Sequence, residues 1–87
     1  MQGGVDVQEL DRLLNTVLPG VVRGAAASGD GRLYRNVMSR VEMPLLRLAL
    51  ELSAGNQLKA ARMLGINRNT LRKKLLEHGI DPGGAQA

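Results

Sequence analysis

Apolar residues recur every three or four positions in several stretches of this 87-residue chain, which is the spacing of an amphipathic helix. The first such stretch predicts a helix over about residues 6–18. Asp6 and Glu9 have the spacing of an N-terminal capping pair, and the breaker pair Pro19-Gly20 predicts where the helix ends. The apolar positions of this helix are Leu10, Leu13, Leu14 and Val17.

A longer helix is predicted over about residues 33–53, and residues 23–31 before it are predicted to form a flexible linker. The linker prediction rests on glycine, alanine and serine side chains, which would pack little. Pro44 removes the hydrogen bond to the Arg40 carbonyl, so a kink is expected in the long helix. The apolar positions of this helix lie on two neighbouring faces: Tyr34, Val37, Met38, Val41, Leu45, Leu48, Ala49 and Leu52 on one, and Met43, Leu46 and Leu50 on the other.

So much apolar surface on the long helix exceeds what a chain of this length can cover by itself. A helix on the surface of a small monomer needs only one apolar stripe, and so short a chain is marginally stable alone. Homodimerisation would cover the second face and is therefore predicted. The residues expected at the dimer interface are Leu10, Leu14, Val37, Val41, Leu45 and Leu48.

Two short helices are predicted to follow the long one. Gly55 ends the long helix, and the next helix is expected over residues 57–64. A glycine-containing turn at residues 65–67 then leads into a last helix over about residues 68–78. An asparagine precedes each short helix and can cap it. Two short helices joined by such a turn are typical of a helix-turn-helix.

The predicted architecture is therefore all-α with four helices. Dimerisation helices occupy residues 1–55, the helix-turn-helix occupies residues 56–80, and residues 81–87 are expected to be a disordered tail. Met1 to Gly4 are expected to be a disordered lead-in.

The composition argues against several functional classes. The chain has no cysteine for a disulfide or thiolate site, and no apolar run approaches the ~20 residues of a membrane span. Glu42 and Glu51 are expected to be isolated surface carboxylates, and the single histidine, His78, to be a cap or packing residue. We therefore expect no enzyme activity, metal or cofactor, and a cytoplasmic location.

Positive charge is concentrated in one segment of the chain. Residues 1–55 carry six basic and six acidic residues, whereas residues 56–80 carry six basic residues and one acidic residue. The second segment therefore has a net charge of +5, and Asp81 brings the chain to its net charge of +4. So localised a positive charge suggests a polyanionic partner.

The last helix has a face suited to double-stranded DNA. Leu71 and Leu75 mark its buried side, and Lys73 lies opposite them with Asn69 and Thr70 nearby. Cations and amides read base edges, while phosphates accept hydrogen bonds from cations and hydroxyls. Two other interpretations stay open: a basic amphipathic anchor on a membrane surface, and a protein-interaction module that uses the long helix.

The segment GNQLKAARMLGINRNTLRKKL resembles the C-terminal helix-turn-helix of the Fis family, which the nucleoid protein Fis shares with NtrC-type regulators. The preceding VEMPLLRLALELSAGNQ resembles the family's long helix, including a proline before paired leucines. The likeness covers about residues 33–80. It implies an intertwined homodimer built from the first two helices, with the paired recognition helices entering successive major grooves.

Site residues follow from the resemblance by position. It implies base contacts from Asn67, Arg68 and Lys73. Lys59 is added to the phosphate contacts on charge grounds, and Asn69 from its place on the exposed face. The other phosphate contacts that the resemblance implies are Asn56, Thr70, Arg72 and Lys74. Leu58 replaces a polar family residue, so one backbone contact per subunit is expected to be missing.

The branch of the family is predicted from two features. Fis carries an N-terminal β-hairpin arm that engages DNA invertases, and a helix beginning near Asp6 leaves no room for it. Residues 65–74 also resemble NtrC-type regulators closely. We therefore expect the DNA-binding domain of an NtrC-type nitrogen regulator, whose receiver and ATPase modules lie outside this chain, since no GxxxxGK[ST] phosphate loop occurs here. The alternatives are a free-standing Fis-like, DNA-bending nucleoid protein and an interaction module without DNA binding.

Overall fold

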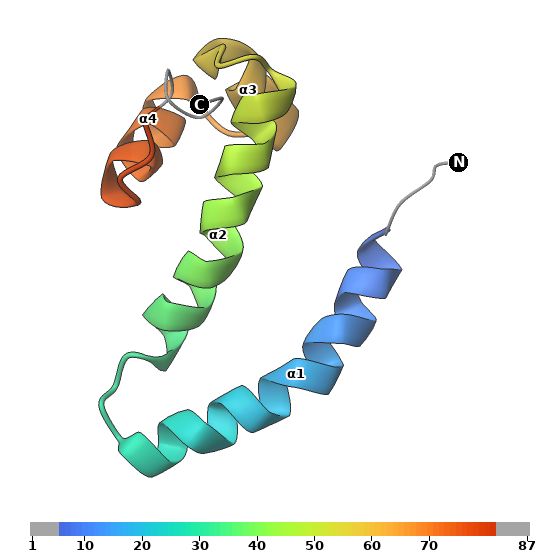
Figure 1. Ribbon diagram of the computed structural model, residues 1–87, viewed down its shortest axis with the longest axis vertical. Coiled ribbons are helices and arrows are strands. Elements are labelled where there is room, and N and C mark those ends of the chain that lie inside the picture. The colour runs from blue at the N-terminus through green and yellow to red at the C-terminus, as the bar shows by residue number, and fades with distance from the viewer. Residues whose placement is uncertain (1–5, 82–87) are drawn as a thin grey trace. The chain divides into compact units, whose positions relative to one another are not determined.

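The computed structural model describes residues 6–81, and this range contains four α-helices and no strand (Figure 1). The prediction of an all-α fold is therefore confirmed. The chain divides into two compact units, residues 1–35 and 36–87, each considered by itself below. The helices are α1 (Val7–Ser28), α2 (Leu33–Leu52), α3 (Gln57–Leu64) and α4 (Arg68–Glu77).

Local chemistry sets both ends of α1. The Asp6 side chain accepts a hydrogen bond from the Glu9 backbone N–H at 2.9 Å, which caps the first turn as predicted. At the other end, Gly29 has a left-handed conformation with φ of 64°, and its N–H donates to the Ala25 carbonyl. Glycine adopts this conformation without a Cβ clash, so it is a common helix terminator. The predicted lead-in, and the predicted tail beyond Asp81, lie outside the described residues.

The predicted end of the first helix near residue 18 is wrong, and so is the predicted flexible linker over residues 23–31. α1 continues through Pro19 to Ser28, and only residues 29–32 separate it from α2. Proline removes one backbone N–H but does not forbid helix on either side of it. Alanine is the strongest helix former, and three alanines follow in this segment, so their small side chains favour helix rather than linker.

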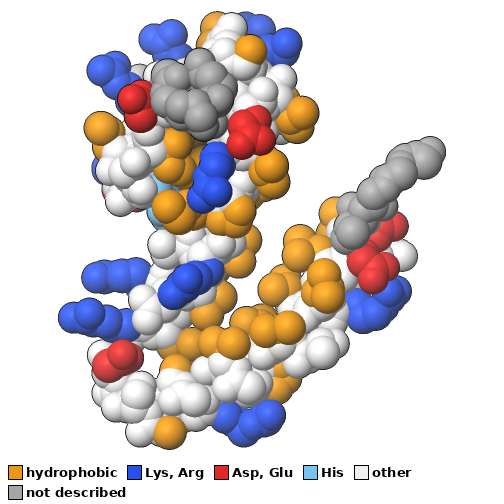
Figure 2. Space-filling model, in the orientation of Figure 1, with side chains coloured by type: hydrophobic (Ala, Val, Ile, Leu, Met, Phe, Trp, Pro, Cys, Tyr) orange, Lys and Arg blue, Asp and Glu red, His pale blue; other side chains and the backbone are white. Residues whose placement is uncertain are grey.

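None of the α1 side chains is buried within the single chain, although one side of the helix is apolar. Figure 2 shows apolar side chains gathered along this helix. An amphipathic helix normally buries its apolar stripe against another element. No helix in the described residues is long and apolar enough to cross a membrane. The exposed apolar residues of α1 are Val7, Leu10, Leu13, Val17, Val21 and Val22.

The core of residues 36–87 forms where α2, α3 and α4 meet. Leu50, Leu71 and Leu75 are its largest fully buried side chains. The α3 helix contributes two alanines, whose small side chains leave room for close packing, and Ile66 in the following turn packs against the same cluster. The buried residues are Leu46, Ala49, Leu50, Ala60, Ala61, Leu71 and Leu75.

Ser53 provides a test of this core. Its side chain is buried, with 3% of its surface exposed, and its Oγ has no hydrogen-bond partner among the described residues. A buried hydroxyl without a partner costs roughly 1–3 kcal/mol. We therefore expect Ser53→Ala to raise the free energy of unfolding by about 1 kcal/mol, measured by urea unfolding at one protein concentration.

Leu50→Ala is the matched control for Ser53→Ala, because it leaves a cavity in the same core. It is expected to lower the free energy of unfolding by about 2–5 kcal/mol. If Ser53→Ala were also destabilising, the hydroxyl would have to make a stabilising hydrogen bond in solution.

Candidate nucleic-acid interface

The turn between α3 and α4 is closed by local hydrogen bonds. Gly65 has a left-handed φ of 77°, which disfavours any side chain, and its N–H donates to the Ala61 carbonyl at 2.8 Å. Asn67 is extended, and its Oδ1 accepts a hydrogen bond from the Asn69 backbone N–H at 2.7 Å. This cap starts α4 at Arg68, so the predicted helix-turn-helix is present with the predicted turn.

The α3 helix begins in the same way. Asn56 is extended, and its Oδ1 accepts a hydrogen bond from the Lys59 backbone N–H at 3.1 Å. Two of the predicted DNA-contacting residues, Asn56 and Asn67, are therefore also helix caps. Because an amide carries donors as well as an acceptor, each cap leaves its NH₂ group for another partner.

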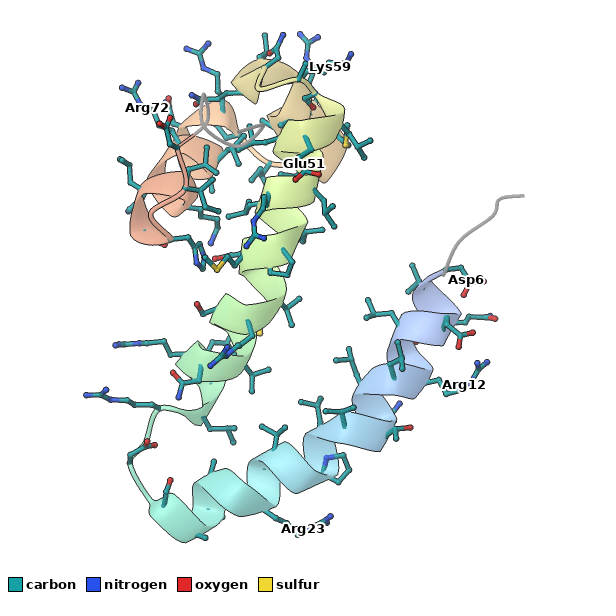
Figure 3. The ribbon with its side chains drawn as sticks, in the orientation of Figure 1. Asp6, Arg12, Arg23, Glu51, Lys59 and Arg72 are labelled. Carbon is teal, nitrogen blue, oxygen red and sulfur yellow. The ribbon has the colours of Figure 1, made fainter. Side chains whose placement is uncertain are left out.

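All but one of the residues predicted to contact DNA are exposed. On α4, Leu71 and Leu75 are buried, and Lys73 on the opposite side is exposed, as the helical spacing predicts. Figure 3 shows Lys59 and Arg72 extending away from the core on α3 and α4. The exposed predicted contacts are Asn56, Lys59, Asn67, Arg68, Asn69, Thr70, Arg72 and Lys73.

The exception is Lys74, which is half-buried and paired with a residue of α2. Its Nζ lies 2.7 Å from Glu42 Oε2. The other carboxylate oxygen, Oε1, lies 2.7 Å from Nε2 of His78, whose side chain is only 9% exposed. One carboxylate on the long helix therefore holds two basic residues one turn apart on α4. We call Glu42, Lys74 and His78 the carboxylate clamp.

The clamp favours the charged forms of its carboxylate and ammonium groups. The pKa of the Glu42 carboxyl lies below its ordinary value, because it accepts hydrogen bonds first from His78 and then from Lys74. The pKa of the Lys74 ammonium is raised by its hydrogen bond to Glu42 and by the negative charge there. An ionised carboxylate can only accept, so Nε2 of His78 carries the proton of the hydrogen bond.

The expectation that Glu42 is an isolated surface carboxylate is therefore wrong, whereas His78 is the C-cap residue of α4, in line with the expected cap role. A signal was available in the sequence. Glu42 precedes the buried Leu46 by four positions, so both lie on the stripe of α2 that faces the core. On α4, His78 follows Leu75 by three positions. Glu42 and His78 therefore border the apolar stripes of α2 and α4, which pack together.

No group of three or more His, Cys, Asp or Glu side chains in the described part of the chain could hold a metal ion. The arrangement that the structure brings together is instead a helix-turn-helix with exposed cations, amides and a hydroxyl on its second helix. Such groups form hydrogen bonds with phosphates and base edges.

Known proteins share this segment. The family described as "Bacterial regulatory protein, Fis family" matches residues 37–78. The DNA-binding protein Fis of Glaesserella parasuis serovar 5 (strain SH0165) is 43% identical over 77 residues, which cover 84% of this chain and 79% of that relative. The chain belongs to the Fis family.

The match with this chain covers a smaller share of two further Fis-family relatives. The DNA-binding protein Fis of Psychromonas ingrahamii is 49% identical over 63 residues, which are 68% of this chain and 64% of the relative. A putative Fis-like DNA-binding protein of Neisseria meningitidis serogroup A is 56% identical over 48 residues, 55% of this chain and 61% of the relative. No solved structure matches the chain at a significant level. Residues 37–78, which match the family, include all three residues of the carboxylate clamp.

The clamp gives the stability of this Fis-family fold a defined pH dependence. The pKa of Glu42 is lower in the folded protein than its ordinary value of 4.5. Its contribution to stability is therefore present above pH 4.5 and is lost as the pH falls through the folded-state pKa. We expect Glu42→Gln to lower the melting temperature at neutral pH, and the difference from wild type to shrink as the pH falls below 4.5.

Thermal unfolding followed by circular dichroism measures this difference. Glu51→Gln is the matched control, because Glu51 is an exposed carboxylate on the same helix. The Glu51→Gln variant is expected to change the melting temperature little across the same pH range. A Glu42→Gln difference that stays constant across the range would show that ionisation of Glu42 does not stabilise the fold.

Proposed function

We propose that this chain is a Fis-like protein that binds double-stranded DNA as a homodimer, in the cytoplasm at the nucleoid. The observation that carries the proposal is the exposed polar face of α4, opposite the buried Leu71 and Leu75. Relatives from three bacteria are named as DNA-binding proteins. The excess of cations in residues 56–80 supplies the attraction to phosphate that non-specific DNA affinity requires.

In this proposal α4 is the recognition helix and lies in the major groove, which is about 12 Å wide and admits an α-helix. Asn67, Arg68 and Lys73 read base edges. The exposed residues around them position the helix by contacting phosphates: Asn56, Lys59, Asn69, Thr70 and Arg72. The first N–H groups of α4 add a further site for a phosphate oxygen.

The exposed apolar surface supports the homodimer. No α1 side chain is buried within one chain, and α2 exposes Val41, Leu45 and Leu48 among others. Soluble monomers rarely expose long apolar stripes. A second copy would cover these residues together with Leu10, Leu14 and Val37. A dimer would also present two recognition helices to one duplex. Once one helix has bound its half-site, the second helix binds intramolecularly and loses less entropy.

The comparisons favour the free-standing Fis-like function over the NtrC-type domain that residues 65–74 suggested. The match to the Glaesserella protein covers most of this chain, well beyond the helix-turn-helix. The relatives given above are named as Fis or Fis-like proteins. We therefore propose a DNA-bending, nucleoid-associated role without enzymatic activity, in which part of the specificity comes from the deformability of the duplex.

DNA binding is tested by fluorescence anisotropy of a labelled duplex of about 30 bp, between about 50 and 200 mM salt. We expect the logarithm of the association constant to fall linearly with the logarithm of salt concentration. Lys73→Ala should weaken binding by about 1–3 kcal/mol, because it removes a hydrogen bond to a base edge. Arg23→Ala is the charge-matched control on α1 and should bind nearly as wild type. Absence of binding at low salt would overturn the proposed function.

The homodimer is tested by sedimentation velocity. Leu45→Glu is expected to shift the wild-type dimer toward monomer, because it places a charge at a residue that is 52% exposed in the single chain and covered in the proposed dimer. Leu76→Glu is the matched control, since Leu76 is 76% exposed on α4 and outside the proposed interface. A monomeric wild-type chain at micromolar concentration would contradict the proposal.

A further inference from the structure

We propose that Glu42 is a positioning residue for DNA binding: through Lys74 and His78 it fixes the recognition helix α4 against α2. This inference rests on the proposed DNA-binding function. It also assigns Lys74 a different role from its neighbour Lys73. Lys74 holds the helix in place, and it is not one of the phosphate contacts.

Tertiary contacts fix α4 in space. This helix has only ten residues, and isolated helices of that length are marginal in water, so its placement depends on tertiary contacts. Its N-terminal end is held by the Asn67 cap and by the turn from α3. Leu71 and Leu75 bury one side, but apolar contacts are not directional. The clamp supplies directional contacts at the C-terminal end.

The geometry of the clamp contacts restrains α4 in more than one direction. Both oxygens of Glu42 are used, each at 2.7 Å from a nitrogen of α4. Hydrogen bonds in which the donor or the acceptor is ionised are short and roughly twice as strong as those between neutral groups, and the Glu42 carboxylate is the ionised acceptor of both contacts. The partners lie one turn apart on α4, so two contacts to a single carboxylate oppose both rotation and sliding of the helix. The 9% exposure of the His78 side chain shields one of these contacts from water.

The adjacent residues Lys73 and Lys74 extend from α4 in different directions. At about 100° per residue, Lys73 lies about 180° from the middle of the stripe formed by Leu71 and Leu75, whereas Lys74 lies only about 80° from it. Lys73 is accordingly exposed. Arg72 lies about 80° from the stripe on its other side and is exposed, so the contact with Glu42 and not direction alone accounts for the half-buried Lys74. The hydrogen bond and the negative charge of Glu42 raise the pKa of the Lys74 ammonium, and the negative charge of Glu77 adds to this.

A phosphate would have to displace this arrangement to bind Lys74. It would break a hydrogen bond of 2.7 Å and leave the Glu42 carboxylate close to the incoming phosphate. Two negative charges at short range repel each other. Because Glu42 already neutralises Lys74, this lysine should release few condensed counterions when DNA binds, and it should contribute little to the salt dependence.

The experiment compares Lys74→Met with Arg72→Met, an exposed cation two positions earlier that is assigned to phosphate. Salt titrations by fluorescence anisotropy on the same duplex give the slope of log affinity against log salt. Arg72→Met should reduce the slope by about 0.9 for each phosphate that it no longer neutralises. Lys74→Met should keep the wild-type slope and weaken binding about tenfold at every salt concentration, the effect expected from removing one hydrogen bond to a charged group.

Glu42→Gln and Glu42→Asp test the sign of the effect. Removing a negative charge should strengthen DNA binding if only net charge mattered, whereas the positioning role predicts weaker binding with an unchanged slope. Glu42→Asp keeps the charge but shortens the side chain, so it should also weaken binding. The double variant of Glu42→Gln with Lys74→Met should lose less affinity than the sum of the losses in the two single variants, because both single variants remove the same Glu42–Lys74 contact. Glu51→Gln is the control with wild-type affinity.

Circular dichroism melts establish that each variant is folded at the assay temperature, and Lys74→Gln replaces Lys74→Met in the slope test if the latter is unfolded. If the Glu42→Gln variant bound DNA more tightly and with a steeper slope, Glu42 would merely prevent Lys74 from contacting a phosphate. That result would overturn the positioning role. A slope lowered equally by Lys74→Met and Arg72→Met would overturn it as well. Failure of the wild-type chain to bind would instead overturn the proposed function, and this inference with it.

Discussion

The burial of Leu71 and Leu75 in one apolar cluster with Leu50 is the interaction on which the rest of this helix-turn-helix depends. Neither α3 nor α4 is long enough to be stable as an isolated helix. Both exist because they complete the apolar face of α2. The same packing decides which side of α4 faces outward. The side chains available to a ligand are therefore selected by the leucines on the opposite side of the helix.

The parts of the fold that local chemistry determines could be predicted from the sequence. The limits of α3 and the start of α4 follow from asparagine caps and from Gly65, which adopts a positive φ without the strain that a Cβ would cause. The end of α1 could not be predicted in this way. Pro19 disfavours helix while the alanines that follow favour it, and only the balance of the two determines the outcome.

The clamp could not be predicted by the periodicity of any one helix. Glu42 and His78 are 36 residues apart in the chain, and they meet only because α2 and α4 pack together where they do. Periodicity shows that each residue borders an apolar stripe. It does not show which stripes pack together, or in which register. The exposed face of α4 needed no such information, because opposite sides of one helix follow from its own spacing.

The clamp also changes how the charge of this segment should be interpreted. Counting residues 56–80 gives six cations against one acid, as though all six faced the same partner. One of them, Lys74, is neutralised by a carboxylate that lies outside the segment, on α2. Adjacent lysines on a helix differ in direction by about 100°. The formal charge of a basic helix therefore overstates the charge it presents to DNA, and the difference is set by the helix that supports it.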